Sequence, residues 1–162
     1  MSRREKQEFE FSPPDVSRVS AYLETLGEAG DGWINLLPGV ELAEEDQPSA
    51  SPGLFGILFG SKTPPVTMGT LMPPKLTRRQ FDGVTIGLMH PTGNKAVARL
   101  SGLGVPLPTG WVVRQDHARR GLVIRTALGT PTGDVVQWTV RAGTALCREE
   151  LTGRWQAIVY LP

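Results

Sequence analysis

The chain has 162 residues, of which 40% are hydrophobic, which is enough for one domain with a core of its own. Its one cysteine, Cys147, excludes an internal disulfide and suggests a reducing compartment. Residues 1–11 lack the apolar stretch of a secretory signal, and no apolar run approaches the roughly 20 residues that cross a bilayer. These features predict a soluble, cytoplasmic protein with no membrane span.

The N-terminal region predicts a charged, frayed end followed by one helix. Residues 1–11 are dominated by charged side chains, so we expect them to be frayed. Ser12 can cap a helix, and Pro13 suits its first position. An apolar stripe at helical spacing follows, and it ends before Gly27 and Gly30: Val16, Val19, Leu23 and Leu26.

The next segment predicts a strand, an acidic loop and a short apolar run. Residues 33–37 have the composition of a strand, and residues 38–53 have that of an acidic mobile loop. The run at 54–60 predicts a short buried strand or turn, or else an apolar knob that docks on a partner. The docking side chains of that knob are Leu54, Phe55, Ile57 and Phe59. A further short strand is expected within residues 66–74.

Residues 78–90 fit either a helix or a strand. Thr77 and Gln80 have the spacing of a capping box, which favours a helix. The alternation of apolar residues favours a strand instead: Val84, Ile86 and Leu88. We favour the helix, since the capping signal is the stronger local pattern.

The second half of the chain predicts helices and strands in alternation. A short helix capped by Asn94 is expected, then two strands at 111–116 and 122–127 joined by a basic turn. Asp134 caps a further helix, and residues 154–162 form a strand that is central in its sheet. One helix face should be apolar, comprising Val135, Trp138, Thr139, Ala142 and Leu146. The opposite face should be polar, comprising Gln137, Arg141, Thr144 and Arg148.

These elements predict an α+β fold in one domain over residues 1–162. We expect a mostly antiparallel sheet packed against three to four helices.

The net charge of +1 conceals a segregation of charge along the chain. Residues 1–74 carry 5 basic and 11 acidic side chains, whereas residues 75–125 carry 9 basic and 2 acidic ones. One interpretation is that the acidic and basic parts lie against each other in the fold. The other is that the basic part forms an exposed face for an acidic partner.

The candidate catalytic residues are the two histidines, His90 and His117. His117 follows Asp116 in a predicted strand, where neighbouring side chains point to opposite faces, so we expect His117 to be a residue of the hairpin turn. His90 precedes Pro91 and is expected near a helix end. Neither the histidines nor Cys147 have the spacing of a zinc site, and phosphate-binding and nucleophile motifs are missing from the sequence. We predict no metal and no cofactor, and Cys147 is expected to pack as a small hydrophobe.

A nucleic-acid interface is one alternative for the basic region. The predicted order of elements over residues 77–127 is helix, break, helix and hairpin. This order resembles that of a winged helix-turn-helix, and the similarity is one of element order and charge. In that interpretation the hairpin binds the DNA backbone through Arg114, Arg119, Arg120 and Arg125. The second helix contributes Lys95 and Arg99.

We place first a non-catalytic interaction or regulatory protein. Its contact surfaces would be the acidic loop, the apolar knob at 54–60 and the basic region at 75–125. Its partner would be another protein or a second copy, since acidic and basic faces on one chain are complementary between copies. A winged-helix-like DNA-binding protein and a small enzyme using His117 or His90 as acid or base are the alternatives.

Overall fold

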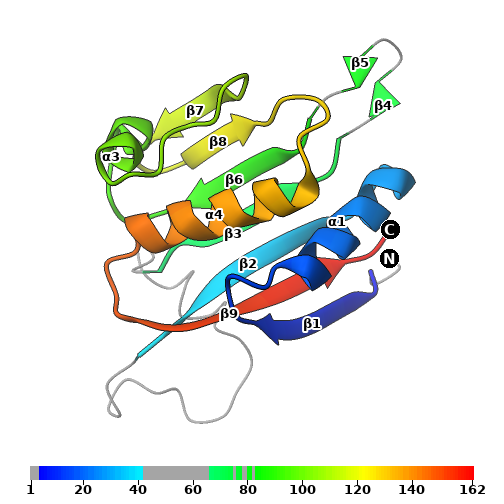
Figure 1. Cartoon of the computed structure of the whole chain (residues 1–162), viewed down its shortest axis with the longest axis horizontal. Helices are drawn as coiled ribbons and strands as arrows, with labels where there is room; N and C mark the ends of the chain where they lie inside the picture. The colour runs from blue at the N-terminus through cyan, green and yellow to red at the C-terminus, as the bar shows by residue number, and fades with distance from the viewer. Residues whose placement is uncertain (1–3, 42–65, 75, 78–79, 82) are drawn as a thin grey trace.

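The computed structural model describes residues 4–41, 66–74, 76–77, 80–81 and 83–162 (Figure 1). These residues form three helices: α1 (Ser17–Ala29), α3 (Ala96–Gly102) and α4 (Thr132–Leu146). Six strands belong to the first and middle parts of the chain: β1 (Lys6–Phe11), β2 (Trp33–Val40), β3 (Met68–Met72), β4 (Leu76–Thr77), β5 (Gln80–Phe81) and β6 (Thr85–Met89). Three more follow α3: β7 (Val112–His117), β8 (Gly121–Arg125) and β9 (Leu151–Tyr160).

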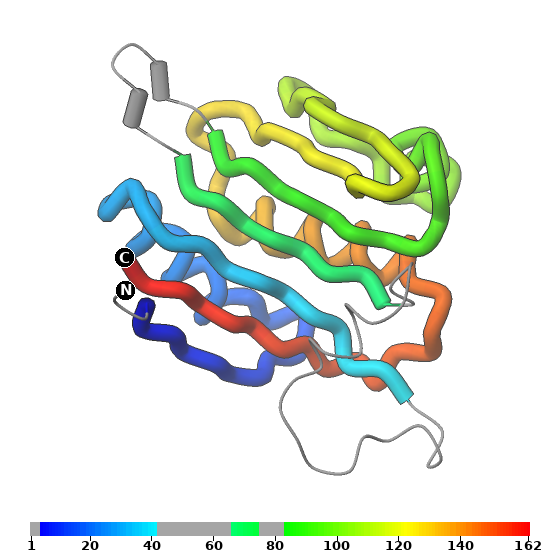
Figure 2. Tube along the Cα trace, turned by 180° about the vertical axis from the view of Figure 1, so that it is seen from behind, coloured from blue at the N-terminus to red at the C-terminus, as the bar shows by residue number. Residues whose placement is uncertain are grey.

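Seven strands form one antiparallel sheet, in the order β1-β9-β2-β3-β6-β8-β7. The short strands β4 and β5 pair with each other in a separate two-stranded sheet. Helices α1 and α4 lie side by side across one face of the sheet, and Figure 2, viewed from behind, shows the strands in front of them. The fold is therefore α+β with an antiparallel sheet, as predicted, and three helices are present in the described residues.

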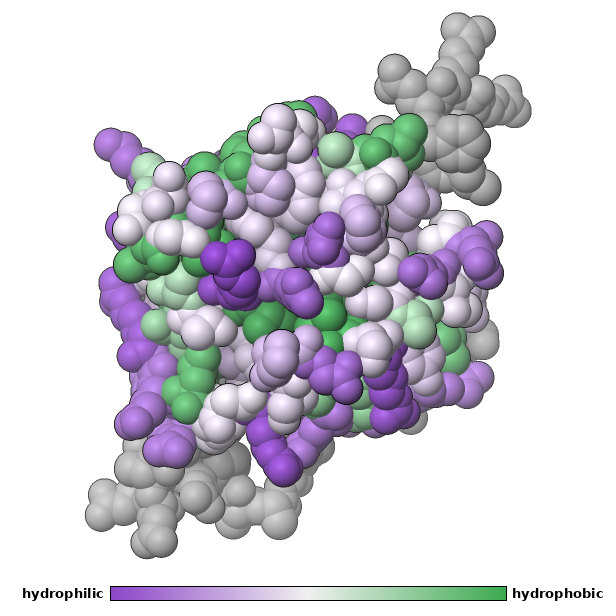
Figure 3. All heavy atoms as spheres, in the orientation of Figure 1, coloured by the Kyte–Doolittle hydropathy of each residue, from purple (hydrophilic) through white to green (hydrophobic). Residues whose placement is uncertain are grey.

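The core lies between this sheet and the helices. Alternate side chains of the central strands point toward the helices and are buried: Ile34, Leu36, Leu71, Ile86, Leu88, Leu122, Ile124, Ala157 and Val159. Helix α1 contributes Val19, Leu23 and Leu26, which are the last three residues of its predicted stripe. On the outer face of the helix layer, hydrophilic and hydrophobic residues are interspersed (Figure 3).

The predicted faces of α4 are confirmed. The five residues expected on its apolar face are all buried, and three of the four expected on its polar side, Gln137, Arg141 and Thr144, are exposed. The fourth, Arg148, is exposed but lies beyond the end of the helix at Leu146. The helix begins two residues before the expected cap, Asp134, whose backbone N–H donates to the Pro131 carbonyl. The capping role predicted for Asp134 is therefore wrong, since that residue already lies in the first turn.

The frayed N-terminus is a wrong prediction for residues 6–11. They form β1, which pairs with β9 along its whole length, and Phe9 and Phe11 point into the core. Helix α1 starts at Ser17 and not at Pro13. The Ser12 carbonyl accepts the N–H of Asp15 in a turn, so Ser12 does not cap the helix.

The helix favoured for residues 78–90 is wrong where the structure describes them, and the strand alternative is correct for residues 85–89. Residues 85–89 form β6, whose Ile86 and Leu88 are buried while Thr85, Gly87 and Met89 lie on the opposite face. Pairing with both β3 and β8 supplies the backbone hydrogen bonds that a helix would have made internally.

Several strand predictions are confirmed. Strand β2 begins at Trp33, β3 lies within residues 66–74, and β7 and β8 form the predicted hairpin. Strand β9 lies inside the sheet, between β1 and β2. The boundaries of the last three strands differ from expectation by one to three residues, since β7 was expected at 111–116, β8 at 122–127 and β9 at 154–162. The acidic loop does not start at residue 38, because β2 continues to Val40, and α3 has Lys95 and not Asn94 at its N-cap.

The rest of the predicted acidic loop and the apolar run at 54–60 lie outside the described residues. Within the described residues, none of the three helices is long and apolar enough to span a membrane.

Candidate functional site

The acidic and basic parts of the chain occupy opposite ends of the sheet. The β1 edge and α1 form the acidic end, where described residues 4–31 carry 3 basic and 7 acidic side chains. The β7 edge, α3 and β8 form the basic end, where residues 83–131 carry 6 basic and 1 acidic side chain. Among the described residues, the acidic side chains of residues 4–31 therefore do not lie against the cations of residues 83–131. The two parts of the chain do meet in the sheet, where β3 pairs with β6, and the acidic residues 44–46 lie outside the described residues.

The turn between β7 and β8 is held in one conformation by its own side chains. Gly121 has φ +80°, and a Cβ there would lie 2.5 Å from the Leu88 carbonyl oxygen, so only glycine fits. His117 Nδ1 accepts the backbone N–H groups of Arg119, at 3.1 Å, and Arg120, at 3.3 Å. His117 is thus the last residue of β7, paired with Gly121, and not a residue of the turn as predicted. Both arginine side chains are exposed.

The carboxylate of Asp116 is directed away from this turn. Its two oxygens accept the N–H groups of Ala96, at 3.0 Å, and Val97, at 3.1 Å, in the first turn of α3. These donors have no partner within the helix, and a carboxylate is the favourable group at a helix N-terminus. The one acidic side chain of described residues 83–131 is consequently engaged by the protein backbone.

A second set of contacts joins the loop before α3 to the hairpin. Asn94 Oδ1 accepts the N–H of Ala118 at 2.8 Å. An Arg99 guanidinium nitrogen donates to the Thr92 carbonyl at 2.6 Å. Lys95 has φ +63° and an exposed side chain. These bonds fix α3 beside the hairpin, and the cations of both elements belong to the same end of the molecule.

We name this surface the basic edge and define it by five exposed cations: Lys95, Arg99, Arg114, Arg119 and Arg120. Within the described part of the chain, the side chains of the last three have no acidic partner within ion-pair distance. Arg125 is on the inner strand β8 and is only half-exposed, so it differs from the other predicted site residues.

The β7 edge also exposes apolar surface that the sequence did not single out. Val112 is 51% exposed and Val113 is 38% exposed. The pairing with β8 shifts register between Val113 and Gln115, which leaves Arg114 without an opposite residue. Such a bulge redirects a side chain at a sheet edge, and here it adds Arg114 to the basic edge.

The second candidate catalytic residue, His90, lies in the interior. Its side chain is 3% exposed, its Nδ1 is 2.9 Å from Thr92 Oγ1, and its Nε2 has no hydrogen-bond partner among the described residues. Burial lowers its pKa below the ordinary 6.5, with a further lowering from Arg99 and an opposing effect from Asp116. Three surface hollows are found among the described residues: one at residues 30–33 and 70–73, one at 13–16 and 137–141, and one at 10, 37–39 and 152–156. His90 lines none of these three.

The structure does not bring the histidines together with a nucleophile or a carboxylate in any of those hollows. Among the described residues, no group of three or more histidine, cysteine, aspartate or glutamate side chains is placed to hold a metal ion. Cys147 is half-buried and packs against the cluster of Leu37, Val66 and Ile158, the environment expected for a small hydrophobe.

The winged-helix interpretation requires a first helix that the described residues do not form. That helix was expected at 78–90, where the described residues form strands β5 and β6. Its second helix, α3, has only 7 residues. The predicted docking residues Leu54, Phe55, Ile57 and Phe59 lie outside the described residues.

Comparison with family models, with curated proteins and with solved structures found no match to this chain.

Proposed function

We propose that this protein is a non-catalytic interaction or regulatory protein that binds an acidic segment of a protein partner through its basic edge. A single observation carries the proposal. Residues 83–131, as the structure describes them, carry six cations and one carboxylate, and that carboxylate accepts two backbone N–H groups of α3 and so is turned away from a partner.

The physical basis is attraction at a solvated surface. Exposed cations without acidic neighbours create a positive potential that raises the association rate of an acidic partner and is screened by salt. Val112 and Val113 add apolar surface beside Arg114, so a segment that combines glutamate or aspartate with apolar residues fits best. The fixed turn conformation lowers the entropic cost of binding, because Arg119 and Arg120 start from an ordered backbone.

The proposal is tested by fluorescence anisotropy with a labelled peptide of alternating glutamate and leucine at low ionic strength. Arg119→Ala with Arg120→Ala should weaken binding, and added salt should weaken it further. Arg4→Ala with Arg154→Ala removes the same number of exposed charges from the acidic end and should leave binding unchanged. Equal binding by the two double variants would contradict the proposal.

Duplex DNA is the second arm of this experiment. Tighter binding of DNA than of the peptide, with the same loss in the Arg119 and Arg120 variant, would assign the basic edge to a nucleic acid and overturn the proposed partner class.

A second copy of the chain is one candidate for the acidic partner, since it presents an acidic end. Light scattering at increasing protein concentration tests this form of the proposal. Self-association that added salt reverses would support it. A monomer mass that stays constant with concentration would exclude the second copy and leave a different protein as the partner. We further propose a cytoplasmic location, which rests on the lone cysteine and the composition alone.

A further inference from the structure

A hollow of about 400 Å³ lies where β2 begins and β3 ends, far from the basic edge. Its size is within the range of small-ligand sites. Seven residues line it: Gly30, Asp31, Gly32, Trp33, Thr70, Met72 and Pro73. The lining thus combines an indole, a thioether and a proline with one hydroxyl and one carboxylate.

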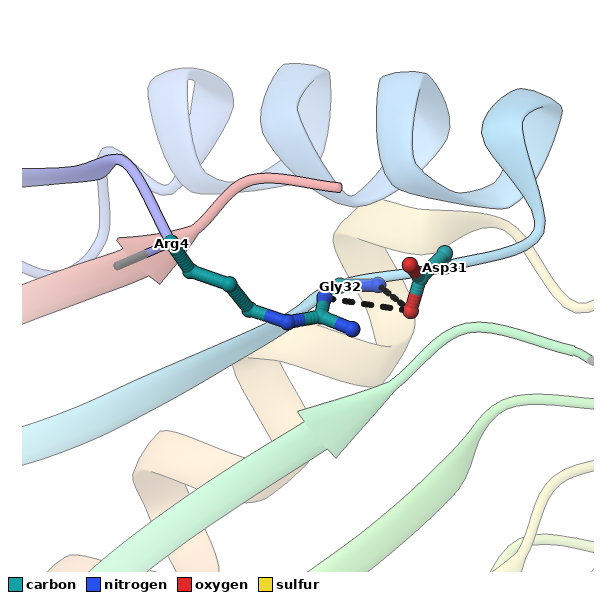
Figure 4. A network of polar contacts seen from close by, with 3 residues as sticks. All are labelled: Arg4, Asp31 and Gly32. Carbon is teal, nitrogen blue, oxygen red and sulfur yellow. Dashed lines mark hydrogen bonds and ion pairs between the residues drawn. The ribbon is translucent and has the colours of Figure 1, made fainter. Parts of the chain in front are cut away.

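The chain already places a guanidinium beside this hollow. Arg4 Cζ lies 5.2 Å from the ring centroid of Trp33, and an Arg4 nitrogen lies 3.1 Å from Asp31 Oδ1. The same oxygen accepts the N–H of Gly32 at 2.7 Å, which orients the carboxylate (Figure 4). An aromatic face and a carboxylate are together the pair of groups that recognises an organic cation.

The electrostatic surroundings favour a cation for a second reason. Helix α1 ends at Ala29, and its cap, Gly30, lines the hollow. A helix C-terminus carries a partial negative charge. The last turn of α1 contains Glu28 and no basic residue, so the neighbouring charges add to that field.

The remaining lining suits an apolar stem. Met72 is 38% exposed, and Trp33 stacks on Tyr160 with ring centroids 4.6 Å apart. The stacked pair holds the indole in place, and the flexible thioether can adapt to an alkyl chain. A long basic side chain has this combination of stem and charge.

We propose that the hollow at Trp33 and Asp31 binds an alkyl guanidinium or ammonium group in competition with Arg4. The ligand's cation takes the place of the Arg4 guanidinium against Asp31, and its stem lies against Trp33 and Met72. Arg4 is the tethered competitor, and its side chain is 40% exposed, so its displacement returns it to water. This site is independent of the proposed function at the basic edge.

The test follows the indole N–H signal of Trp33 by NMR, identified by its loss in Trp33→Phe. The probes are acetyl-Gly-Arg-Gly-amide, its neutral citrulline counterpart, and ethylguanidinium as a small free cation. The arginine peptide should shift the Trp33 signal and the citrulline peptide should not. Arg4→Ala should tighten binding up to about fivefold, the range expected for release of an exposed ion pair. Asp31→Asn should weaken binding by a comparable factor.

A matched control is the ion pair of Arg154 with Glu10, which has the same 3.1 Å separation and is exposed on the sheet. Arg154→Ala and Glu10→Gln should not change the affinity. Tighter binding of the peptide than of ethylguanidinium supports a polypeptide side chain as the ligand, and equal binding supports a small organic cation. An unmoved Trp33 signal, equal binding of the citrulline peptide, or no tightening in Arg4→Ala would each overturn the proposal. The Arg119 and Arg120 variant should bind these cations normally, which separates this test from that of the basic edge.

Discussion

Asp116 and His117 are consecutive residues of β7, yet they bond to different parts of the protein. The Asp116 carboxylate accepts two N–H groups of α3, and His117 Nδ1 accepts two N–H groups of the β7–β8 turn. Neither side chain is oriented by the other, so they do not form an acid–base dyad. Together they fix the helix and the turn that carry the cations of the basic edge.

Removal of the Asp116 carboxylate should destabilise the protein. Asp116→Ala leaves two N–H groups of α3 without their acceptor, and we expect the free energy of unfolding to fall by about 1–2 kcal/mol. Asp116→Asn keeps one acceptor oxygen and should cost less. Urea unfolding measures both, with Glu10→Gln as the exposed control. If Asp116→Ala lowered the free energy of unfolding no more than the control does, the two hydrogen bonds would contribute nothing to stability.

The stability of the protein should decrease as the pH falls below about 6.5, because burial lowers the pKa of His90 from that value. Below pH 6.5 the His90 side chain of the unfolded chain binds a proton that the folded chain does not bind. The free energy of unfolding therefore decreases as the pH falls from 6.5 to the lower pKa of His90 in the folded protein. The slope from this residue is at most about 1.4 kcal/mol per pH unit. Hydrogen bonds from Ser17 lower the pKa of Asp15 from its ordinary 3.8, so this residue affects the pH dependence of stability only in the more acidic range around and below that pH.

Chemical unfolding of the wild type and of His90→Gln from pH 7 to pH 5 checks this expectation. The variant is expected to be less stable at pH 7 but to show a shallower pH dependence. Parallel curves for the two proteins would assign the pH dependence to other groups.

Gly121 and Gly129 form a matched pair, because their φ angles are +80° and +78°. A Cβ on Gly129 meets nothing within 4 Å, whereas one on Gly121 meets the Leu88 carbonyl oxygen at 2.5 Å. Gly129→Ala should therefore cost only the backbone strain, about 1–2 kcal/mol. Gly121→Ala should cost clearly more in thermal or urea unfolding, and equal losses would indicate that β6 and the turn can separate freely.

Phe9 tests whether β1 is an integral strand. Its ring is 8% exposed, stacks on Tyr22 at 5.6 Å and lies 4.0 Å below the Arg18 guanidinium carbon. Phe9→Ala should lower the free energy of unfolding by about 3–5 kcal/mol. Val113→Ala, at an exposed edge, should change it by no more than about 0.5 kcal/mol. A frayed N-terminus would instead make the two variants alike.

Elements whose apolar residues recur at one clear spacing could be predicted from the sequence. The α4 faces, for instance, follow from apolar residues at helical spacing, and the β7–β8 hairpin follows from two apolar runs around a basic turn with a glycine. In both cases the local pattern and the tertiary contacts agree.

The wrong predictions for β1 and for residues 78–90 have different causes. The alternation of Glu8, Phe9, Glu10 and Phe11 is a strand signal, but the partner of this strand is β9, more than 140 residues away. At residues 78–90 a local capping pattern favoured a helix. Gly83 approaches the Thr126 backbone so closely that a Cβ would lie 2.0 Å from its carbonyl oxygen, a requirement that only the folded sheet reveals.

The candidate site shows the same division. The exposed arginines of the turn could be predicted from the sequence. The two bonds that Asp116 accepts from residues 20 and 19 positions earlier could not. The placement of the acidic and basic parts at opposite ends depends on strand order, which composition does not determine.

The most direct test of the proposed function is to locate the bound acidic peptide. Backbone amide NMR shifts, recorded at low ionic strength during titration with the glutamate–leucine peptide, report the contacted residues. We predict the largest changes at Arg114, Arg119, Arg120 and Lys95, with β1 unaffected. Changes centred on β1 and α1, or no changes at any residue under these conditions, would contradict the proposal.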